Sequence, residues 1–137
     1  MPGKKDRIII DTNLWISFLL TNDYSSLDII LSNSKVVLIF SEGLLNEFIE
    51  VANRPKFSKY FSSQDLQDLL LQIKNHGEFI ISLSITNICR DPKDNFLLSL
   101  SKDGKASHLI TGDKDLLDLK RYGKTKIITL KKYFTQN

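Results

Sequence analysis

The chain has 137 residues, of which 42% are hydrophobic and 26% charged, with a formal net charge of +3. These values are typical of one globular domain that can bury a core, so we expect a single domain over residues 1–137. The longest apolar run covers only residues 36–40 and there is a single cysteine, which excludes a transmembrane helix and a disulfide framework. We therefore expect a cytoplasmic protein with no membrane partner.

Short apolar runs that suit buried strands alternate with longer segments that suit helices. We predict strands at residues 7–11, 35–40, 78–83, 107–111 and 126–130, and helices at residues 12–19, 24–33, 41–55, 62–77 and 91–104. Because helical segments separate the strands, the strands are predicted to be mostly parallel, with helices on both faces. The expected fold class is α/β, a three-layer α/β/α sandwich around a central sheet of about five strands.

Capping residues support the three longest predicted helices, since Ser and Asp accept hydrogen bonds from free N–H groups at a helix start. The predicted starts are Ser41, Ser62 or Ser63, and Asp91 followed by Pro92, and the predicted ends are Pro55, Gly77 and Gly104. The helix after Asp91 is the best marked, because proline is favoured at the first helical position.

Two acidic residues stand at the ends of predicted strands. Asp11 ends the strand at residues 7–11, and Asp113 follows the strand at residues 107–111 after Gly112. Ligands of open parallel sheets bind beyond the carboxyl ends of the strands, so these acids are expected to meet there if their strands are neighbours. Taken singly, each acid is explained equally well as the cap of a following helix.

Two further acids lie on predicted helices and lean toward the same edge. Glu47 lies just outside the apolar arc of its helix, and Asp94 lies in the first turn of its own, on the packed face with Leu97. Considered singly, Glu47 is explained as a solvated residue at the rim of the protein surface, and Asp94 is explained as an acid in the first helical turn that the helix dipole favours. Together with Asp11 and Asp113 they form a cluster whose mutual repulsion a cation would relieve.

A cluster of carboxylates indicates which cation to expect. All-oxygen ligands suit Mg²⁺ or Mn²⁺ rather than zinc, and His76 and His108 lack the spacing of a zinc site. An Mg²⁺ ion held in this way activates water and binds phosphate oxygens, which is the chemistry of phosphodiester hydrolysis. If Asp115 joins the four acids, the five carry −5 and the rest of the chain carries +8, a distribution that suits a polyanionic substrate.

Four segments, taken in order, resemble the PIN-domain family, and most closely its branch of toxins from toxin–antitoxin pairs akin to VapC. They are "IIIDTNLWIS", "SEGLLNEFIEVANRPKF", "CRDPKDNFLLSLS" and "HLITGDKDLLDL", and the similarity extends from about residue 7 to residue 134. The resemblance implies an α/β/α sandwich and a ribonuclease that depends on Mg²⁺ or Mn²⁺. It also implies a cognate antitoxin protein as partner and a homodimer as the oligomeric state.

Matched motif by motif, the resemblance also assigns the site residues. The catalytic acids are Asp11, Glu47, Asp94 and Asp113, and the expected metal ligands are Asp11, Asp94, Asp113 and Asp115. The first metal ion is expected on Asp11, Asp94 and Asp113, with Glu47 and Asp115 assisting or holding a second. Asn13 and Thr111 match polar positions that support the site.

Basic residues supply the candidate contacts to RNA. Arg54 and Lys56 belong to a stretch, "RPKF", that is common in this branch of the family. Lys131 and Lys132 belong to residues 120–134, where basic and aromatic side chains are interleaved in a way that suits a nucleic-acid backbone. Residues 120–134 are explained equally well as a solvated face around the last strand.

Trp15 departs from the family pattern, which usually has a small aliphatic residue at this position. Two interpretations are open: the indole fills the core under the first helix, or it offers a surface on which a base stacks. Of the two, we favour core filling.

The leading hypothesis is a metal-dependent endoribonuclease that acts on RNA as the toxin of a type II toxin–antitoxin system. One alternative is a non-catalytic RNA- or protein-binding PIN module, which the complete set of acids disfavours. Another is an Asp-dependent phosphotransferase on a similar sheet. A phosphatase of the haloacid-dehalogenase type needs an acid at position 13, where Asn13 stands, and no glycine-rich phosphate loop is present.

Overall fold

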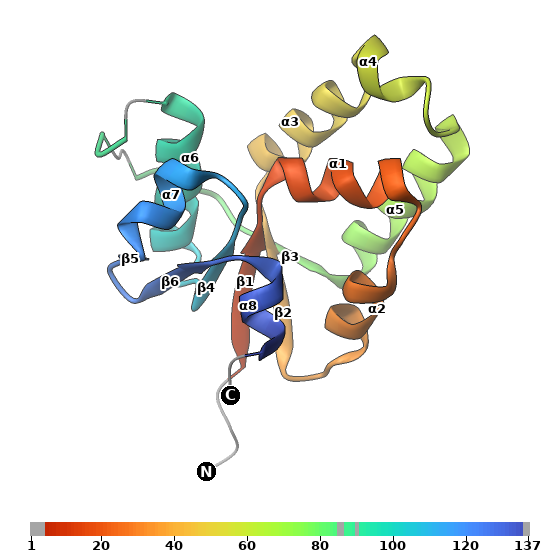
Figure 1. Cartoon of the computed structure of the whole chain (residues 1–137). Helices are drawn as coiled ribbons and strands as arrows, with labels where there is room; N and C mark the ends of the chain where they lie inside the picture. The colour runs from red at the N-terminus through yellow and green to blue at the C-terminus, as the bar shows by residue number, and fades with distance from the viewer. Residues whose placement is uncertain (1–4, 85–86, 90, 136–137) are drawn as a thin grey trace.

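A twisted six-stranded sheet forms the centre of the protein in a computed structural model that describes residues 5–84, 87–89 and 91–135 (Figure 1). The strands are β1 (Asp6–Ile10), β2 (Val36–Phe40), β3 (Gly77–Phe79), β4 (His108–Ile110), β5 (Arg121–Tyr122) and β6 (Thr125–Ile128). Their order across the sheet is β3-β2-β1-β4-β6-β5. Neighbouring strands pair in parallel, except that the short edge strand β5 pairs antiparallel with β6.

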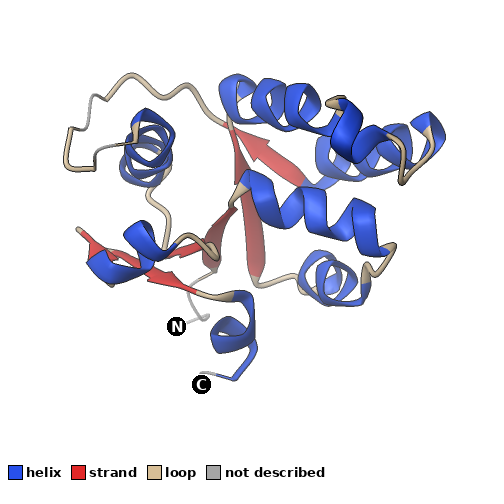
Figure 2. Cartoon of the chain, turned by 45° about the horizontal axis from the view of Figure 1, so that its top comes forward, coloured by secondary structure: helices blue, strands red, loops and turns tan. Residues whose placement is uncertain are grey.

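Helices cover both faces of this sheet and confirm the α/β/α sandwich. The helices are α1 (Thr12–Thr21), α2 (Ser25–Ser32), α3 (Glu42–Ala52), α4 (Pro55–Ser58), α5 (Ser63–His76), α6 (Pro92–Asp103), α7 (Lys114–Leu119) and α8 (Leu130–Thr135). Figures 1 and 2 show α1, α2, α3 and α5 grouped on one side and α6 and α7 on the other. The helices divide between the two faces because the chain moves outward from β1 to β3 and then returns past β1 to β4. Since parallel crossovers are almost always right-handed, this change of direction moves the following helices to the other face.

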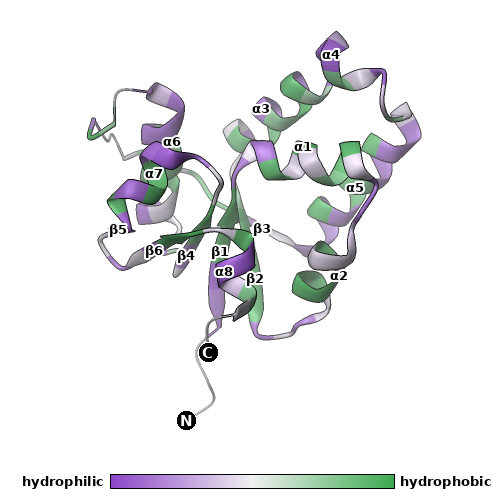
Figure 3. Ribbon diagram, viewed as in Figure 1, coloured by the Kyte–Doolittle hydropathy of each residue, from purple (hydrophilic) through white to green (hydrophobic). Residues whose placement is uncertain are grey.

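The inner strands are apolar over most of their length, because helices cover both of their faces. Ile8, Ile9 and Ile10 of β1 are each 0% exposed, and Ile39 and Phe40 of β2 are equally buried. The hydropathy colouring shows most of the central sheet as hydrophobic, apart from the hydrophilic start of β1 (Figure 3). No helix in the described part of the chain is both long and apolar enough to cross a bilayer.

Trp15 lies in this core, so the core-filling interpretation is confirmed. The residue is 0% exposed, and its ring contacts Phe18 edge-on and packs against Phe40 and Phe48. Its indole N–H donates a hydrogen bond to the carbonyl oxygen of Ile10 at 3.0 Å. A large aromatic residue therefore fastens α1 to the end of β1, directly beside Asp11.

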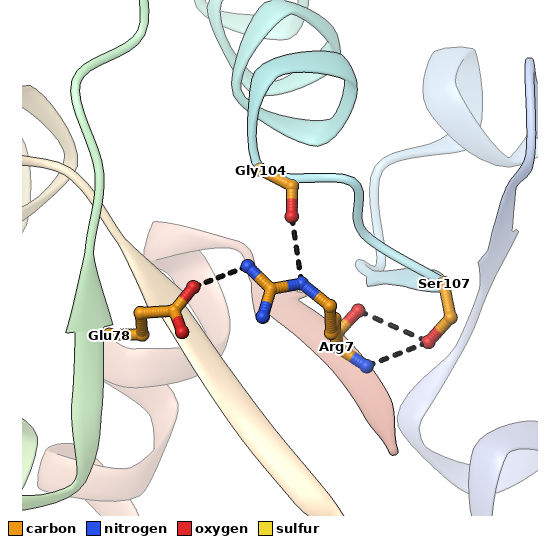
Figure 4. Close-up of polar contacts among 4 residues, drawn as sticks. All are labelled: Arg7, Glu78, Gly104 and Ser107. Atoms are coloured by element: carbon orange, nitrogen blue, oxygen red, sulfur yellow. Dashed lines mark hydrogen bonds and ion pairs between the residues drawn. The ribbon is translucent and has the colours of Figure 1, made fainter. Parts of the chain in front are cut away.

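Arg7 joins three elements at the opposite end of β1 (Figure 4). Its guanidinium donates to the Glu78 carboxylate of β3 and, through Nε, to the Gly104 carbonyl at 2.9 Å. Its backbone N–H donates to the Ser107 hydroxyl at 2.9 Å, and that hydroxyl donates to the Arg7 carbonyl at 3.2 Å. These bonds link β1 to β3, to the end of α6 and to the start of β4, so the two halves of the sheet keep a fixed register.

The predicted helix starts agree with the structure. The Ser41 hydroxyl accepts a hydrogen bond from the Leu44 N–H, and Ser62 forms a reciprocal capping box with Asp65. The Asp91 carboxylate accepts from the Lys93 N–H at the start of α6. Each of these caps satisfies an N–H group that the helix itself leaves free.

Several predicted boundaries were wrong, most clearly at the third strand. The strand predicted at residues 78–83 is only Gly77–Phe79, because the Asp103 carboxylate accepts hydrogen bonds from the backbone N–H groups of Leu83 and Ser84. Ile81 and Leu83 are each 83% exposed, so this segment does not continue the buried strand.

Other boundaries moved by a few residues for local reasons. Pro55 does not stop α3, which ends at Ala52; it opens the short helix α4, where its missing N–H costs nothing. The first strand ends at Ile10, one residue before Asp11, and the last strand ends at Ile128 because Leu130 begins α8. The sheet has six strands rather than about five because residues 121–122 add the edge strand β5.

We expect Trp15→Phe to lower the free energy of unfolding by about 1–3 kcal/mol, because it deletes a buried hydrogen bond and leaves a small void. Urea unfolding followed by circular dichroism measures the change. Leu71→Ala is the control, since Leu71 is 58% exposed and should shift stability by less than about 0.5 kcal/mol. Equal effects of the two substitutions would contradict a structural role for Trp15.

Candidate metal and catalytic site

Asp11 and Asp113 lie at the same edge of the sheet, as the sequence predicts. Their strands β1 and β4 are neighbours, with Ile10 opposite Ile110, so both strands end at the same level of the sheet. The Thr111 hydroxyl donates a hydrogen bond to Asp11 Oδ2 at 2.7 Å and accepts one from the Asp113 N–H at 3.0 Å. Thr111 therefore links the Asp11 carboxylate to the backbone of Asp113.

Asp94, Asp113 and Asp115 make the tightest acidic group among the described residues. One carboxylate oxygen from each lies within 4.8 Å of the others. Asp94 comes from the first turn of α6, while Asp113 caps α7 and accepts a hydrogen bond from the Asp115 N–H at 2.9 Å. The amino-terminal ends of two helices thus meet at this point, where their partial positive charge favours carboxylates.

Asp94 provides the test of whether these residues fit a metal ion. The residue is only 4% exposed, and its Oδ2 atom has no hydrogen-bond partner. Among the described residues, no other buried side-chain oxygen or nitrogen lacks a partner in this way. An unpartnered buried carboxylate oxygen is costly unless a cation or a proton neutralises it. Three carboxylates with one such oxygen fit a hard divalent cation such as Mg²⁺ or Mn²⁺.

Without a cation, the cluster favours protonation. Burial, the neighbouring carboxyl of Asp113 and the charges of Asp91 and Asp11 raise the pKa of Asp94 to about 7. Burial also raises the pKa of Asp11, and the hydrogen bond from Thr111 only partly offsets that effect. A divalent cation would take the place of the shared proton and remove the repulsion.

A cavity of about 210 Å³ opens beside the acids and brings most of the predicted site together. It is lined by Asp11, Thr12, Asn13, Glu47, Val51, Arg54, Lys56, Phe57, Asp91, Lys93, Asp94, Leu97 and Asp113. Glu47 lies outside the tightest acidic group: its Oε2 accepts from the Thr12 hydroxyl at 3.1 Å, and its Oε1 lies 3.8 Å from Lys93 Nζ. Asp115 belongs to the tightest group, and Asp11 lies beside that group, linked to Asp113 through Thr111.

Arg54 and Lys56 line this cavity, so the structure brings both near the acids. Lys131 and Lys132 lie instead on α8 and are not among the residues that line it. The separation arises because α8 turns back toward the start of the sheet, where Tyr133 donates a hydrogen bond from its hydroxyl to Asp6.

Sequence reasoning missed two residues that organise the site. Lys93 supplies a positive charge inside the cavity, and its position between Asp91 and Asp94 in "DPKD" was the available signal. Asn95 holds the segment that leads into α6, because its amide accepts from the Cys89 N–H at 2.8 Å and donates to the Cys89 carbonyl at 2.7 Å. The sequence offers no periodic signal for that second contact.

Comparison with known proteins agrees with this geometry. The sequence profile described as the PIN domain matches residues 7–115, which contain all five acids. The chain belongs to the PIN domain family. It is also 33% identical over 138 aligned positions to the uncharacterized protein MJ1680 of Methanocaldococcus jannaschii, an alignment that covers 96% of this chain and 88% of that protein. No solved structure matches the chain.

PIN domains are generally metal-dependent nucleases, and the acidic cluster of this PIN domain agrees with that chemistry. Its donors are oxygen atoms only, and they come from the starts of α6 and α7 at the carboxyl edge of the sheet. The family therefore indicates divalent-metal chemistry, and the acidic cluster is a place in this structure that could bind such an ion.

We expect the metal-free PIN domain to lose stability as the pH rises from about 4 to about 7. The pKa of Asp94 is raised from 3.8 to about 7, so the folded chain holds a proton that the unfolded chain releases in this range. Asp94→Asn cannot release that proton and should flatten the dependence and raise stability at pH 8. Urea unfolding in a chelator at several pH values measures both effects; a large loss of stability in Asp94→Asn would show that the carboxylate is mainly structural.

Proposed function

We propose that this PIN domain is a metal-dependent endoribonuclease that hydrolyses phosphodiester bonds in RNA. The observation that carries the proposal is the convergence of Asp94, Asp113 and Asp115 around a buried carboxylate oxygen that has no partner. Asp11 adjoins them through Thr111, and Glu47 faces the same cavity. The arrangement supports a catalytic centre rather than a binding module, because a protein that only binds RNA has no use for clustered carboxylates.

The side chains have separate roles in this proposal. Asp94, Asp113 and Asp115 hold the Mg²⁺ or Mn²⁺ ion, with Asp11 as a further ligand. When bound, such an ion lowers the pKa of a bound water and stabilises the charge that develops on phosphate oxygens. Thr111 and Asn13 orient Asp11, since the Thr111 hydroxyl and the Asn13 backbone N–H both donate hydrogen bonds that favour its charged form.

The basic side of the cavity suits the phosphate chain of the substrate. Arg54, Lys56 and Lys93 line the same cavity as the acids, and Lys93 lies 3.8 Å from Glu47. Their positive charges attract a polyanion that the carboxylates alone would repel. RNA is therefore proposed to enter across α3 and α4, with its scissile phosphate directed toward Asp94 and Asp113.

We further propose that the protein acts as the toxin of a type II toxin–antitoxin system, paired with a cognate antitoxin protein. This role is supported by the resemblance of four ordered segments to toxins of the VapC type. A cytoplasmic location belongs to the same proposal, because RNA and the antitoxin would meet the toxin in the cytoplasm. A homodimer also belongs to it, as the oligomeric state that the family resemblance implies.

We expect Asp11→Asn to reduce metal-dependent RNA cleavage by more than about a hundredfold, since loss of groups that only orient metal ligands already costs 10–100-fold. The measurement is cleavage of total RNA with Mg²⁺, with Mn²⁺ or with a chelator. Asp118→Asn is the matched control, because Asp118 is an exposed acid on α7 outside the cavity. Cleavage that survives in Asp11→Asn, or that needs no metal, would refute the mechanism.

Expression in a bacterial host tests the toxin role separately. We expect the wild-type chain and Asp118→Asn to arrest growth and Asp11→Asn to leave growth unchanged, because arrest requires cleavage of cellular RNA. Growth curves after induction measure the effect. Metal-dependent cleavage in vitro without growth arrest would retain the nuclease and reject the toxin role.

A further inference from the structure

A second cavity lies at the opposite edge of the sheet from the acids and has the opposite charge. Its volume is about 610 Å³, and it is lined by Ser101, Lys102, Lys105, Ala106, Tyr122, Gly123, Lys124 and Thr125. These residues come from the end of α6, the start of the segment into β4, and the turn between β5 and β6. We call this feature the lysine pocket.

The charge of the lysine pocket is not balanced within the described part of the protein. Lys102, Lys105 and Lys124 are exposed and form no ion pair with any described residue. The nearest acid in sequence, Asp103, directs its carboxylate to the hydroxyls of Ser82 and Ser84. Three ammonium groups around one cavity therefore favour an anionic ligand.

The floor of the lysine pocket is already satisfied in its hydrogen bonding. The Ala106 N–H donates to the Ser101 carbonyl at 2.9 Å, and the Thr125 hydroxyl donates to the Ala106 carbonyl at 2.7 Å. The Lys105 N–H likewise donates to the Lys102 carbonyl, so these carbonyl groups near the end of α6 do not repel an anion as free acceptors. The lysine side chains are left as the groups that a ligand can meet.

The backbone around the lysine pocket places two of its residues in an unusual conformation. Gly123 has φ 58°, which glycine adopts freely, whereas Lys105 has φ 52°, which a lysine adopts only at a cost. Glycine or asparagine would suit the position of Lys105 better. A lysine there agrees with a use for its charge.

We propose that the lysine pocket binds a nucleotide phosphate, with Lys102, Lys105 and Lys124 as donors and Tyr122 as an aromatic wall. The position favours a nucleotide within an RNA strand, so the proposal rests on the proposed function and extends its footprint. The helix α6 joins the two sites: Asp94 lies in its first turn and Lys102 in its last, which puts them about 12 Å apart along the helix axis. An RNA strand of a few nucleotides covers that distance.

Binding of a labelled single-stranded RNA of about ten nucleotides, without metal, tests the proposal. The pocket variant is Lys102→Gln with Lys124→Gln, and the matched control is Lys35→Gln with Lys74→Gln, which removes the same charge from exposed positions elsewhere. Each lost phosphate contact should weaken binding about fivefold at about 0.1 M salt and lower the salt slope by about 0.7. We therefore expect an effect of about 25-fold in the pocket variant and less than about twofold in the control.

A second variant and a second ligand complete the experiment. Lys105→Asn removes one charge and keeps a residue that tolerates positive φ, so its expected effect is about fivefold without loss of the fold. Calorimetry with AMP tests whether the phosphate comes from a free nucleotide. AMP binding that the pocket variant abolishes would support the lysine pocket as a site for a free nucleotide. Equal RNA affinity in pocket variant and control, with no AMP binding, overturns the proposal.

The two proposals fail in different ways. The nuclease is tested by metal-dependent cleavage, whereas the lysine pocket is tested by binding in a chelator. RNA binding that depends on Lys102 and Lys124 in a protein that does not cleave would retain the pocket and reject the nuclease. Metal-dependent cleavage by the wild-type protein, together with RNA affinity that the pocket variant leaves unchanged and no AMP binding, would retain the nuclease and reject the lysine pocket.

Discussion

Repulsion between carboxylates that meet at one end of a parallel sheet is the constraint on which the arrangement of this protein depends. The sheet places Asp11 and Asp113 side by side because β1 and β4 pair in register. Two helix starts then add Asp94 and Asp115 to the same edge. Burial and the neighbouring carboxylates raise the pKa of Asp94 and of Asp11, and the fold tolerates the cluster because a proton or a cation can occupy the space between the acids.

Much of the surrounding structure holds this edge in place. Trp15 fastens α1 to the carbonyl of Ile10, immediately before Asp11, and Thr111 bonds to Asp11 and to the backbone of Asp113. At the other end of the same strand, Arg7 ties β1 to β3 and to the end of α6. Rigid positions on both ends of β1 are what a metal site needs, since its ligands must be held close together against their own repulsion.

Charge is divided between two cavities on opposite edges of the molecule. The acidic cavity has a basic border formed by Arg54, Lys56 and Lys93, so it suits a ligand that carries both phosphate and a metal ion. The lysine pocket has three lysines and no acid in its lining, so it suits phosphate alone. A modest net charge of +3 conceals this division, and only the spatial arrangement of the charges makes it evident.

The sequence by itself determined the α/β class, the helix caps, the buried strands and the strand-end acids, because these depend on local patterns of apolar, capping and turn residues. It did not determine where the strand after α5 stops, since Asp103 competes for that backbone from a position about 20 residues away. Nor did it rank the acids: the placing of Asp115 in the closest group, the pairing of Lys93 with Glu47 and the unpartnered oxygen of Asp94 were decided by the tertiary structure. Those features depend on distances between side chains from separate helices, and no local pattern in the sequence encodes such distances.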